Sequence, residues 1–136
     1  MEIAICPYRP QNHHELVALY RANGWSNYAD HPDLLLKAYR NSLSSFTAWD
    51  ADKLVGAVRA VGDGCSILYI QDLLVLPEYQ RKGIGSMLLR AMDGAYPHVR
   101  QKVLLTDDLE RTRKFYDKCG YSVCTRMNCI AYVKMG

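Results

Sequence analysis

The chain reads Gln80-Arg81-Lys82-Gly83-Ile84-Gly85-Ser86 at the point where an apolar run ends and a helical pattern begins. The apolar run ends at Leu76-Pro77, and apolar residues recur at helical spacing from Ile84. A strand is therefore predicted to enter a glycine-containing loop that leads into a helix N-terminus. Free backbone N–H groups and the positive end of the helix dipole favour an anion there, and glycine lets the backbone approach a ligand. We expect this loop to hold a phosphate-bearing cofactor.

Two other phosphate-binding loops fit the sequence poorly. A Walker-type loop ends in Gly-Lys-Ser/Thr, whereas Ser86 follows Gly85 directly. A dinucleotide-binding G-x-G-x-x-G that starts at Gly83 would need glycine at position 88, which is Leu88. A G-x-G pattern alone is also compatible with a purely structural turn, so other parts of the sequence have to decide.

Length and composition predict one domain over residues 1–136. A chain of 136 residues buries enough surface for one core, and its 49% hydrophobic and 23% charged residues are ordinary for a globular protein. The net charge of +3 is too small to imply nucleic acid as a partner. No signal peptide and no stretch long enough to span a membrane is present in the sequence. We expect a soluble protein without a membrane partner.

The cysteines indicate a reducing compartment and no metal. There are five of them, an odd number, and none forms a C-x-x-C pair. This pattern argues against a disulfide framework and against a zinc site. Free thiols suit the cytosol, so a cytoplasmic location is predicted.

The order of elements predicts an α+β fold with a mixed, mainly antiparallel sheet flanked by helices, in the order βααβββαβαββ. One βαβ crossover falls at the glycine loop. Helices are expected around Leu16–Tyr20, after a cap at Asp30 or His31, from Gly85 to Gly94, and after a cap at Asp107 or Asp108 with Glu110 in a capping box. Strands are expected over residues 2–6, 46–49, 54–61, 66–76, 103–106, 121–125 and 129–133.

Two polar residues interrupt the apolar strand that precedes the loop. Gln71 and Asp72 lie within Ile67–Leu76, a run typical of a central strand covered on both faces. A buried carboxylate is costly unless it is paired or hydrated. Asp72 could accept a proton from a substrate, directly or through water. It could equally bond a neighbouring loop or Arg59, and the sequence leaves both interpretations open.

Two segments together resemble a known family. Residues 71–85 resemble the acetyl-CoA motif of the GCN5-related N-acetyltransferase (GNAT) superfamily, in which Q/R-x-x-G-x-G/A binds the pyrophosphate; Gln80, Gly83 and Gly85 match its fixed positions. Residues 115–121, Phe-Tyr-Asp-Lys-Cys-Gly-Tyr, resemble the second motif of that superfamily, F-Y-x-k-x-G-F/Y. The motifs occur in the right order, and the close resemblance covers about residues 44–124.

The resemblance implies the GNAT fold and acetyl-CoA as co-substrate. Backbone N–H groups at the loop would hold the pyrophosphate. The backbone of Leu74–Leu76 would pair with the pantetheine arm, beside a bulge in the strand, and the N–H of Leu74 or Val75 would polarise the thioester carbonyl. The cofactor-binding residues implied are Leu74, Val75, Leu76, Gln80, Arg81, Lys82, Gly83, Ile84, Gly85, Ser86 and Tyr116.

Tyr116 stands where family members protonate the departing thiolate. An ordinary tyrosine, with a pKa of about 10, carries that proton at neutral pH. The alternative is a core aromatic, because Leu109, Thr112, Tyr116 and Cys119 share one predicted helix face. Many family members carry Asn at the position of Leu109, so a cofactor contact from that position is not expected here.

The sequence indicates the acetyl acceptor less specifically than it indicates acetyl-CoA. In the superfamily the first two helices usually form the substrate wall, and here Trp25, Tyr28 and Gln71 are candidate substrate-binding residues, although each aromatic could belong to the core. The predicted activity is transfer of an acetyl group to a primary amine of a small molecule, with Asp72 as base and Tyr116 as acid. The rivals are a non-catalytic acetyl-CoA sensor and a protein lysine or N-terminal acetyltransferase. A homodimer through an exposed strand edge stays open.

Overall fold

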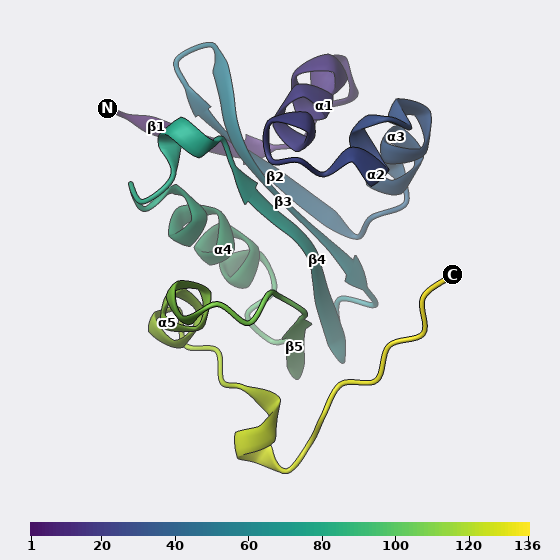
Figure 1. Ribbon diagram of the computed structural model, residues 1–136, viewed down its shortest axis with the longest axis vertical. Helices are drawn as coiled ribbons and strands as arrows, with labels where there is room; N and C mark the ends of the chain where they lie inside the picture. The colour runs from purple at the N-terminus through teal and green to yellow at the C-terminus, as the bar shows by residue number, and fades with distance from the viewer. The chain divides into compact units, whose positions relative to one another are not determined.

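A five-stranded sheet runs through the first of two units in the computed structural model, which describes residues 1–136. The units are Met1–Leu105 and Thr106–Gly136. The strands lie in sequence order, and all neighbours are antiparallel except β4 and β5, which are parallel (Figure 1). They are β1 (Ile3–Pro7), β2 (Ser44–Asp50), β3 (Lys53–Gly62), β4 (Ile67–Val75) and β5 (Gln101–Leu104).

Helices cover both faces of this sheet. α1 (His13–Ala22), α2 (Ser26–Ala29) and α3 (Pro32–Arg40) lie on one side, and α4 (Ile84–Ala95) lies on the other (Figure 1). The strand alternation agrees: Arg59 points toward the tyrosines of α2 and α3, whereas Gly56, three residues earlier, faces α4. Because both faces are covered, β3 and β4 are buried along most of their length, as their apolar sequences predict.

The absence of a side chain at Gly56 permits α4 to pack closely on β3. A Cβ there would lie 3.0 Å from Leu88 Cδ1 and 3.2 Å from the Leu74 carbonyl oxygen. Gly56 also pairs with Val75 of β4. The helix that follows the glycine loop is thus held against the strand that precedes the loop, which positions the βαβ crossover.

The first unit confirms the predicted order of elements. Pro32 occupies the first turn of α3, with His31 as N-cap. α4 connects the parallel strands β4 and β5, as the crossover prediction requires. The short helix α2 was not predicted. Two 3-10 turns, η1 (Pro10–Asn12) and η2 (Pro77–Tyr79), flank α1 and the glycine loop. No helix combines the length and the apolar character that a membrane span needs.

The second unit corrects two predictions. Helix α5 (Glu110–Lys118) has Leu109 as its N-cap, not Asp107 or Asp108, and no side chain caps it. Asp107 instead accepts the N–H of Leu109 at 3.1 Å. Because the helix begins at Glu110, this residue is at the first helical position and not the third, so the capping box does not form.

The two C-terminal strands predicted over 121–125 and 129–133 are also absent. Residues 124–127 form the 3-10 helix η3 (Cys124–Met127), and no strand follows it. Local backbone bonds, such as Cys129 N–H to the Cys124 carbonyl at 3.2 Å, turn this segment back on itself. An alternating sequence forms a strand only when a ladder partner satisfies its backbone, and these short-range bonds replace the ladder.

Candidate active site

The glycine loop ends in a helix N-terminus that no side chain caps. Gly83 is the N-cap of α4, with a left-handed φ of 83°, and Arg81 is also left-handed at 64°. Such residues before a helix turn successive N–H groups toward one concave side, and the first-turn N–H groups of a helix have no partner within it. The space where a Cβ of Gly83 would lie is open, with nothing within 4 Å. These features suit a bound phosphate.

The Gln80 side chain holds the loop in place through hydrogen bonds. Its Nε2 donates to the Val75 carbonyl at 3.1 Å and to Asn23 Oδ1 at 3.4 Å. This side chain therefore connects the loop to the end of β4 and to the α1–α2 connection. Its amide nitrogen is directed toward β4, so we assign Gln80 a positioning role in the candidate phosphate site. The sequence motif does not reveal this contact.

Positive charge and a fixed tyrosine accompany the loop. Arg81 and Lys82 are exposed, and Lys82 Nζ lies 5.5 Å from the centroid of the Tyr79 ring. The Tyr79 hydroxyl donates to Asp50 Oδ2 at 2.7 Å, which anchors the ring beside the loop. Two exposed cations beside uncapped N–H groups favour a multiply charged anion over a neutral ligand.

The edge of β4 becomes free just upstream of this loop. The β4–β5 ladder runs from Ile67 to Ile70 and stops, whereas β4 continues to Val75. On the other edge, Leu76 N–H donates to the Val55 carbonyl at 2.8 Å. In an antiparallel ladder, alternate residues direct their backbone groups to the partner strand. Leu74 therefore points its backbone toward β3, as Leu76 does, and Val75 points its N–H to the open edge.

This alternation narrows the predicted pantetheine contacts. Of the stretch Leu74–Leu76, only Val75 presents its backbone to the open edge, and its carbonyl already accepts the Gln80 amide. Of the two carbonyl-polarising donors that the sequence left open, the geometry favours the Val75 N–H over that of Leu74. A bulge is also present, but it lies further upstream than the resemblance implied: Arg59 pairs with Asp72 and Ala60 pairs with Ile70, so Gln71 is the extra residue.

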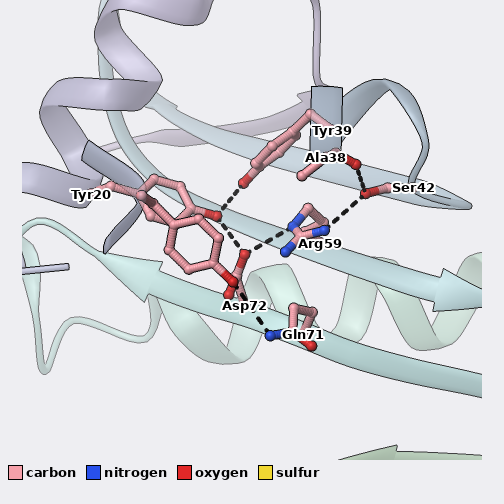
Figure 2. A network of polar contacts seen from close by, with 8 residues as sticks. Tyr20, Ala38, Tyr39, Ser42, Arg59, Gln71 and Asp72 are labelled. Atoms are coloured by element: carbon pink, nitrogen blue, oxygen red, sulfur yellow. Dashed lines mark hydrogen bonds and ion pairs between the residues drawn. The ribbon is translucent and has the colours of Figure 1, made fainter. Parts of the chain in front are cut away.

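Asp72 lies in a buried polar network (Figure 2). Its Oδ2 accepts the Tyr20 hydroxyl at 2.8 Å and Arg59 Nε at 2.8 Å, and only 3% of Asp72 is exposed. The Tyr20 and Tyr39 hydroxyls are 2.7 Å apart, and Arg59 Nη1 donates to Ser42 Oγ at 3.3 Å. The structure thus contains the Arg59 contact that the sequence offered as an alternative to a catalytic role.

The network holds one cation, one anion and neutral hydroxyls. Burial raises the pKa of Tyr20 and of Tyr39, so both hydroxyls keep their protons. Burial opposes the charge on Arg59, but the Asp72 carboxylate outweighs it and raises the pKa of the guanidinium. A buried ion pair needs such additional hydrogen bonds to offset its desolvation. The sequence indicated Tyr20 only as a substrate-wall or core aromatic and did not link Tyr20 or Tyr39 to Asp72, although a tyrosine on a buried helix face has a hydroxyl that needs a partner.

The predicted acceptor residues gather beside this network. Gln71 Nε2 lies 3.4 Å from the Tyr28 hydroxyl, to which it donates. The Tyr28 and Trp25 rings meet the Tyr20 ring edge-on, with centroids 5.3 and 5.6 Å away, and the guanidinium carbon of Arg59 lies 5.9 Å from the Tyr28 centroid. Tyr20 is fully buried, whereas Trp25 and Tyr28 are half-buried and Gln71 is exposed. Only the latter three can meet a ligand.

Comparison with known proteins identifies the family. The family described as acetyltransferase (GNAT) domain matches residues 41–123, which is more than half of the chain. The chain belongs to the GNAT acetyltransferase family. A GNAT-family acetyltransferase from Streptococcus pneumoniae TIGR4 shares its fold with a TM-score of 0.89 and 34% identity, over 99% of this chain and 98% of that one.

Two further relatives match this chain at lower identity or over a shorter stretch. The aminoglycoside acetyltransferase AAC(6')-Iy, solved with a CoA-containing bisubstrate analogue, has a TM-score of 0.77 at 19% identity, over 100% of both chains, which shows the shared fold. A protein of Gibberella zeae named as a putative acetyltransferase is 40% identical over 57 residues, which are 40% of this chain and 32% of that protein. The matched part thus spans about a third of that relative's length.

The second GNAT motif lies in the second unit, on α5. The Tyr116 ring meets Phe115 and Tyr121 edge-on, at centroid distances of 4.9 and 6.0 Å. Burial, together with the nearby Cys119 and Asp107, raises the pKa of Tyr116 to about 12. The phenol is therefore protonated at neutral pH, as a proton donor must be. Leu109, which stands where many GNAT members have Asn, is exposed at the start of the helix.

Proposed function

We propose that the protein is an acetyl-CoA-dependent N-acetyltransferase that acts on the primary amine of a small molecule. The observation that carries the proposal is the combination of an uncapped helix N-terminus at Gly83 with a free β4 edge at Val75. A phosphate at the loop and an extended amide-bearing arm along the strand edge match the two ends of CoA. The CoA complexes of AAC(6')-Iy, which has the same fold, support this assignment.

The donor side divides its work among backbone groups. The N–H groups from Arg81 to Ser86 would hold the pyrophosphate, with Arg81 and Lys82 adding positive charge. The open edge at Val75 would pair with the pantetheine arm, and the Val75 N–H would donate to the thioester oxygen. When bound, acetyl-CoA supplies a carbonyl carbon that an amine can attack, with the CoA thiol as leaving group.

Two side chains would move protons in the transfer. As the nitrogen–carbon bond forms and the carbon–sulfur bond breaks, Tyr116 would give its proton to the sulfur, in the role that its motif position implies. The proton of the attacking ammonium would go to Asp72 through water, because Asp72 is 3% exposed and its Oδ2 is held by Tyr20 and Arg59. Trp25, Tyr28 and Gln71 would line the acceptor site.

A small amine is favoured over a protein substrate for two reasons. The mildly basic net charge of +3 gives little attraction to a lysine-rich tail. The half-buried aromatics beside Gln71 suit a compact or ring-bearing amine. Five free cysteines further support a cytoplasmic location as part of the proposal.

Calorimetry combined with thiol release tests the proposal against its rivals. The enzyme is titrated with acetyl-CoA and then assayed for CoA thiol with amines, aminosugars, amino acids and lysine peptides. The proposal predicts binding, and thiol release with at least one small amine. Binding without release for any acceptor would support the sensor; release with peptides alone would support a protein acetyltransferase. No binding would overturn the donor site.

A further inference from the structure

The strand pair β3–β4 contains one more residue on one side than on the other. Gly62 pairs with Leu68 at the turn, and Arg59 pairs with Asp72 further along. Three steps separate Gly62 from Arg59, whereas four separate Leu68 from Asp72. One residue of β4 must therefore bulge between these pairs, and the register change places it at Gln71.

Both ends of this mismatched stretch are fixed by side chains. At the turn, Asp63 Oδ1 accepts the N–H groups of Cys65, Ser66 and Ile67 at 2.8, 2.8 and 3.0 Å. The Ser66 hydroxyl, which donates to Asp63 Oδ2, and these backbone N–H groups lower the pKa of Asp63. At the other end, the Arg59–Asp72 ion pair crosses from β3 to β4 at 2.8 Å and is buried.

The register beyond the bulge decides which amides face the open edge. A one-residue slip moves every backbone and side-chain group of a strand to the opposite side. In the observed register, Leu74 faces β3 and Val75 faces the open edge. Without the bulge, Leu74 would face the open edge and Val75 would be used in the ladder. Asp72 would also turn away from Tyr20 and Arg59.

We propose that the Arg59–Asp72 pair is a positioning device that fixes the β4 register and so presents the Val75 N–H to acetyl-CoA. Arg59 is then a positioning residue for the donor site, although its own side chain is directed to Asp72, Ser42 and the tyrosines (Figure 2). The proposal rests on the proposed function for the identity of the ligand, but the register it assigns is a property of the free chain.

The test measures amide hydrogen exchange residue by residue in the free protein, and CoA binding by calorimetry. In the parent protein Leu74 and Leu76 should exchange slowly and Val75 quickly. In Arg59→Met the difference in exchange rate between Val75 and its two neighbours should shrink or reverse. CoA binding should weaken roughly tenfold, which corresponds to about one lost hydrogen bond. Arg59→Lys, which keeps the charge, should retain most of the alternation.

A matched control separates register from general destabilisation. Val58→Ala removes buried volume beside Arg59 on the same strand and leaves the ion pair in place. It should lower the melting temperature yet keep the exchange alternation and CoA affinity within about twofold. If Val58→Ala and Arg59→Met lose CoA affinity equally at equal loss of stability, the proposal is overturned.

A second variant covers the case in which Arg59→Met does not fold. Asp72→Asn keeps the shape of the partner side chain but removes its charge, so it should reduce the difference in exchange rate between Leu74 and Val75 in the same way. An unchanged difference in this variant would overturn the proposal. If the parent protein bound no CoA, the proposed function would fail, while the exchange pattern of the variants would still decide the register claim.

Discussion

The Tyr116 phenol is the residue on which the proposed proton transfer to sulfur depends. Tyr116→Phe removes the donated proton and keeps the ring that packs against Phe115 and Tyr121. We expect kcat to fall by roughly 10²-fold or more, as for other general acids, with acetyl-CoA affinity nearly unchanged. Steady-state kinetics and calorimetry would measure the two effects.

Tyr132→Phe is the control for this variant, because Tyr132 is another tyrosine of the second unit and is 90% exposed. It should have the kcat of the parent protein. Unchanged turnover in Tyr116→Phe would remove Tyr116 from the acid role.

The raised pKa of Tyr116 makes a separate prediction about pH. With a pKa of about 12, Tyr116 keeps its proton well above neutral pH. Ionisation of Tyr116 should therefore not lower kcat between about pH 8 and pH 10, the range in which an ordinary tyrosine begins to ionise. A decline in kcat centred near pH 10 that disappears in Tyr116→Phe would contradict the burial of this phenol.

The same shift affects stability at alkaline pH. The unfolded tyrosine loses its proton near pH 10, whereas folded Tyr116 keeps it to about pH 12. The stabilisation linked to its protonated form is therefore complete below about pH 10 and is lost as the pH rises toward 12.

Gly83 should not tolerate substitution, because its backbone has a left-handed conformation. Its φ of 83° costs any other residue about 1–2 kcal/mol, and a larger side chain would fill the open space beside the helix N-terminus. Gly83→Leu should abolish CoA binding in calorimetry. Gly94→Ala in the same helix, at a position with open space and no positive φ, should bind CoA normally and gain about 0.5–1 kcal/mol. Normal CoA binding by Gly83→Leu would refute the loop assignment.

At the scale of elements, β4 carries different functions on its two edges. One edge pairs with β3 as far as the Leu76–Val55 bond, and the other is free after Ile70. We expect the Val75 amide to gain strong protection from hydrogen exchange when CoA binds, whereas Leu74 should be protected with or without the ligand. Protection of Val75 in the free protein would contradict the open edge.

The elements that the sequence predicted correctly are those with strong local patterns. The glycine loop, the apolar central strands and Pro32 at the start of α3 all follow from spacing or from backbone preference. The bulge at Gln71 could not be predicted, because it results from two distant pairings, Gly62–Leu68 and Arg59–Asp72. Pairing of Asp72 with Arg59 was recognised only as an alternative, since nothing local to either strand aligns the two residues.

In the C-terminal segment, the sequence predicted strands that the structure does not contain. Its alternation predicted strands, but a strand needs a partner, and the bonds around η3 satisfy part of the backbone locally instead. The capping prediction failed for a similar reason, because Asp107 bonds the N–H of Leu109 before the helix begins. In both cases a short-range hydrogen bond replaced the interaction that the pattern favoured.

At the scale of the whole molecule, the family match over residues 41–123 extends across both units. The first unit contains the glycine loop, the β4 edge and the Asp72 network, and the second contains Tyr116. The donor half of the reaction rests on named backbone groups, while the acceptor rests on three side chains, Trp25, Tyr28 and Gln71.

Acetyl transfer itself is the most direct test. The protein is incubated with acetyl-CoA and a panel of small amines, and both the released CoA thiol and the acetylated amine are quantified by mass spectrometry. We predict equal amounts of the two products for at least one amine, and loss of both in Gly83→Leu. Tight acetyl-CoA binding with neither product for any amine, peptide or aminosugar would contradict the assignment of this chain as an N-acetyltransferase.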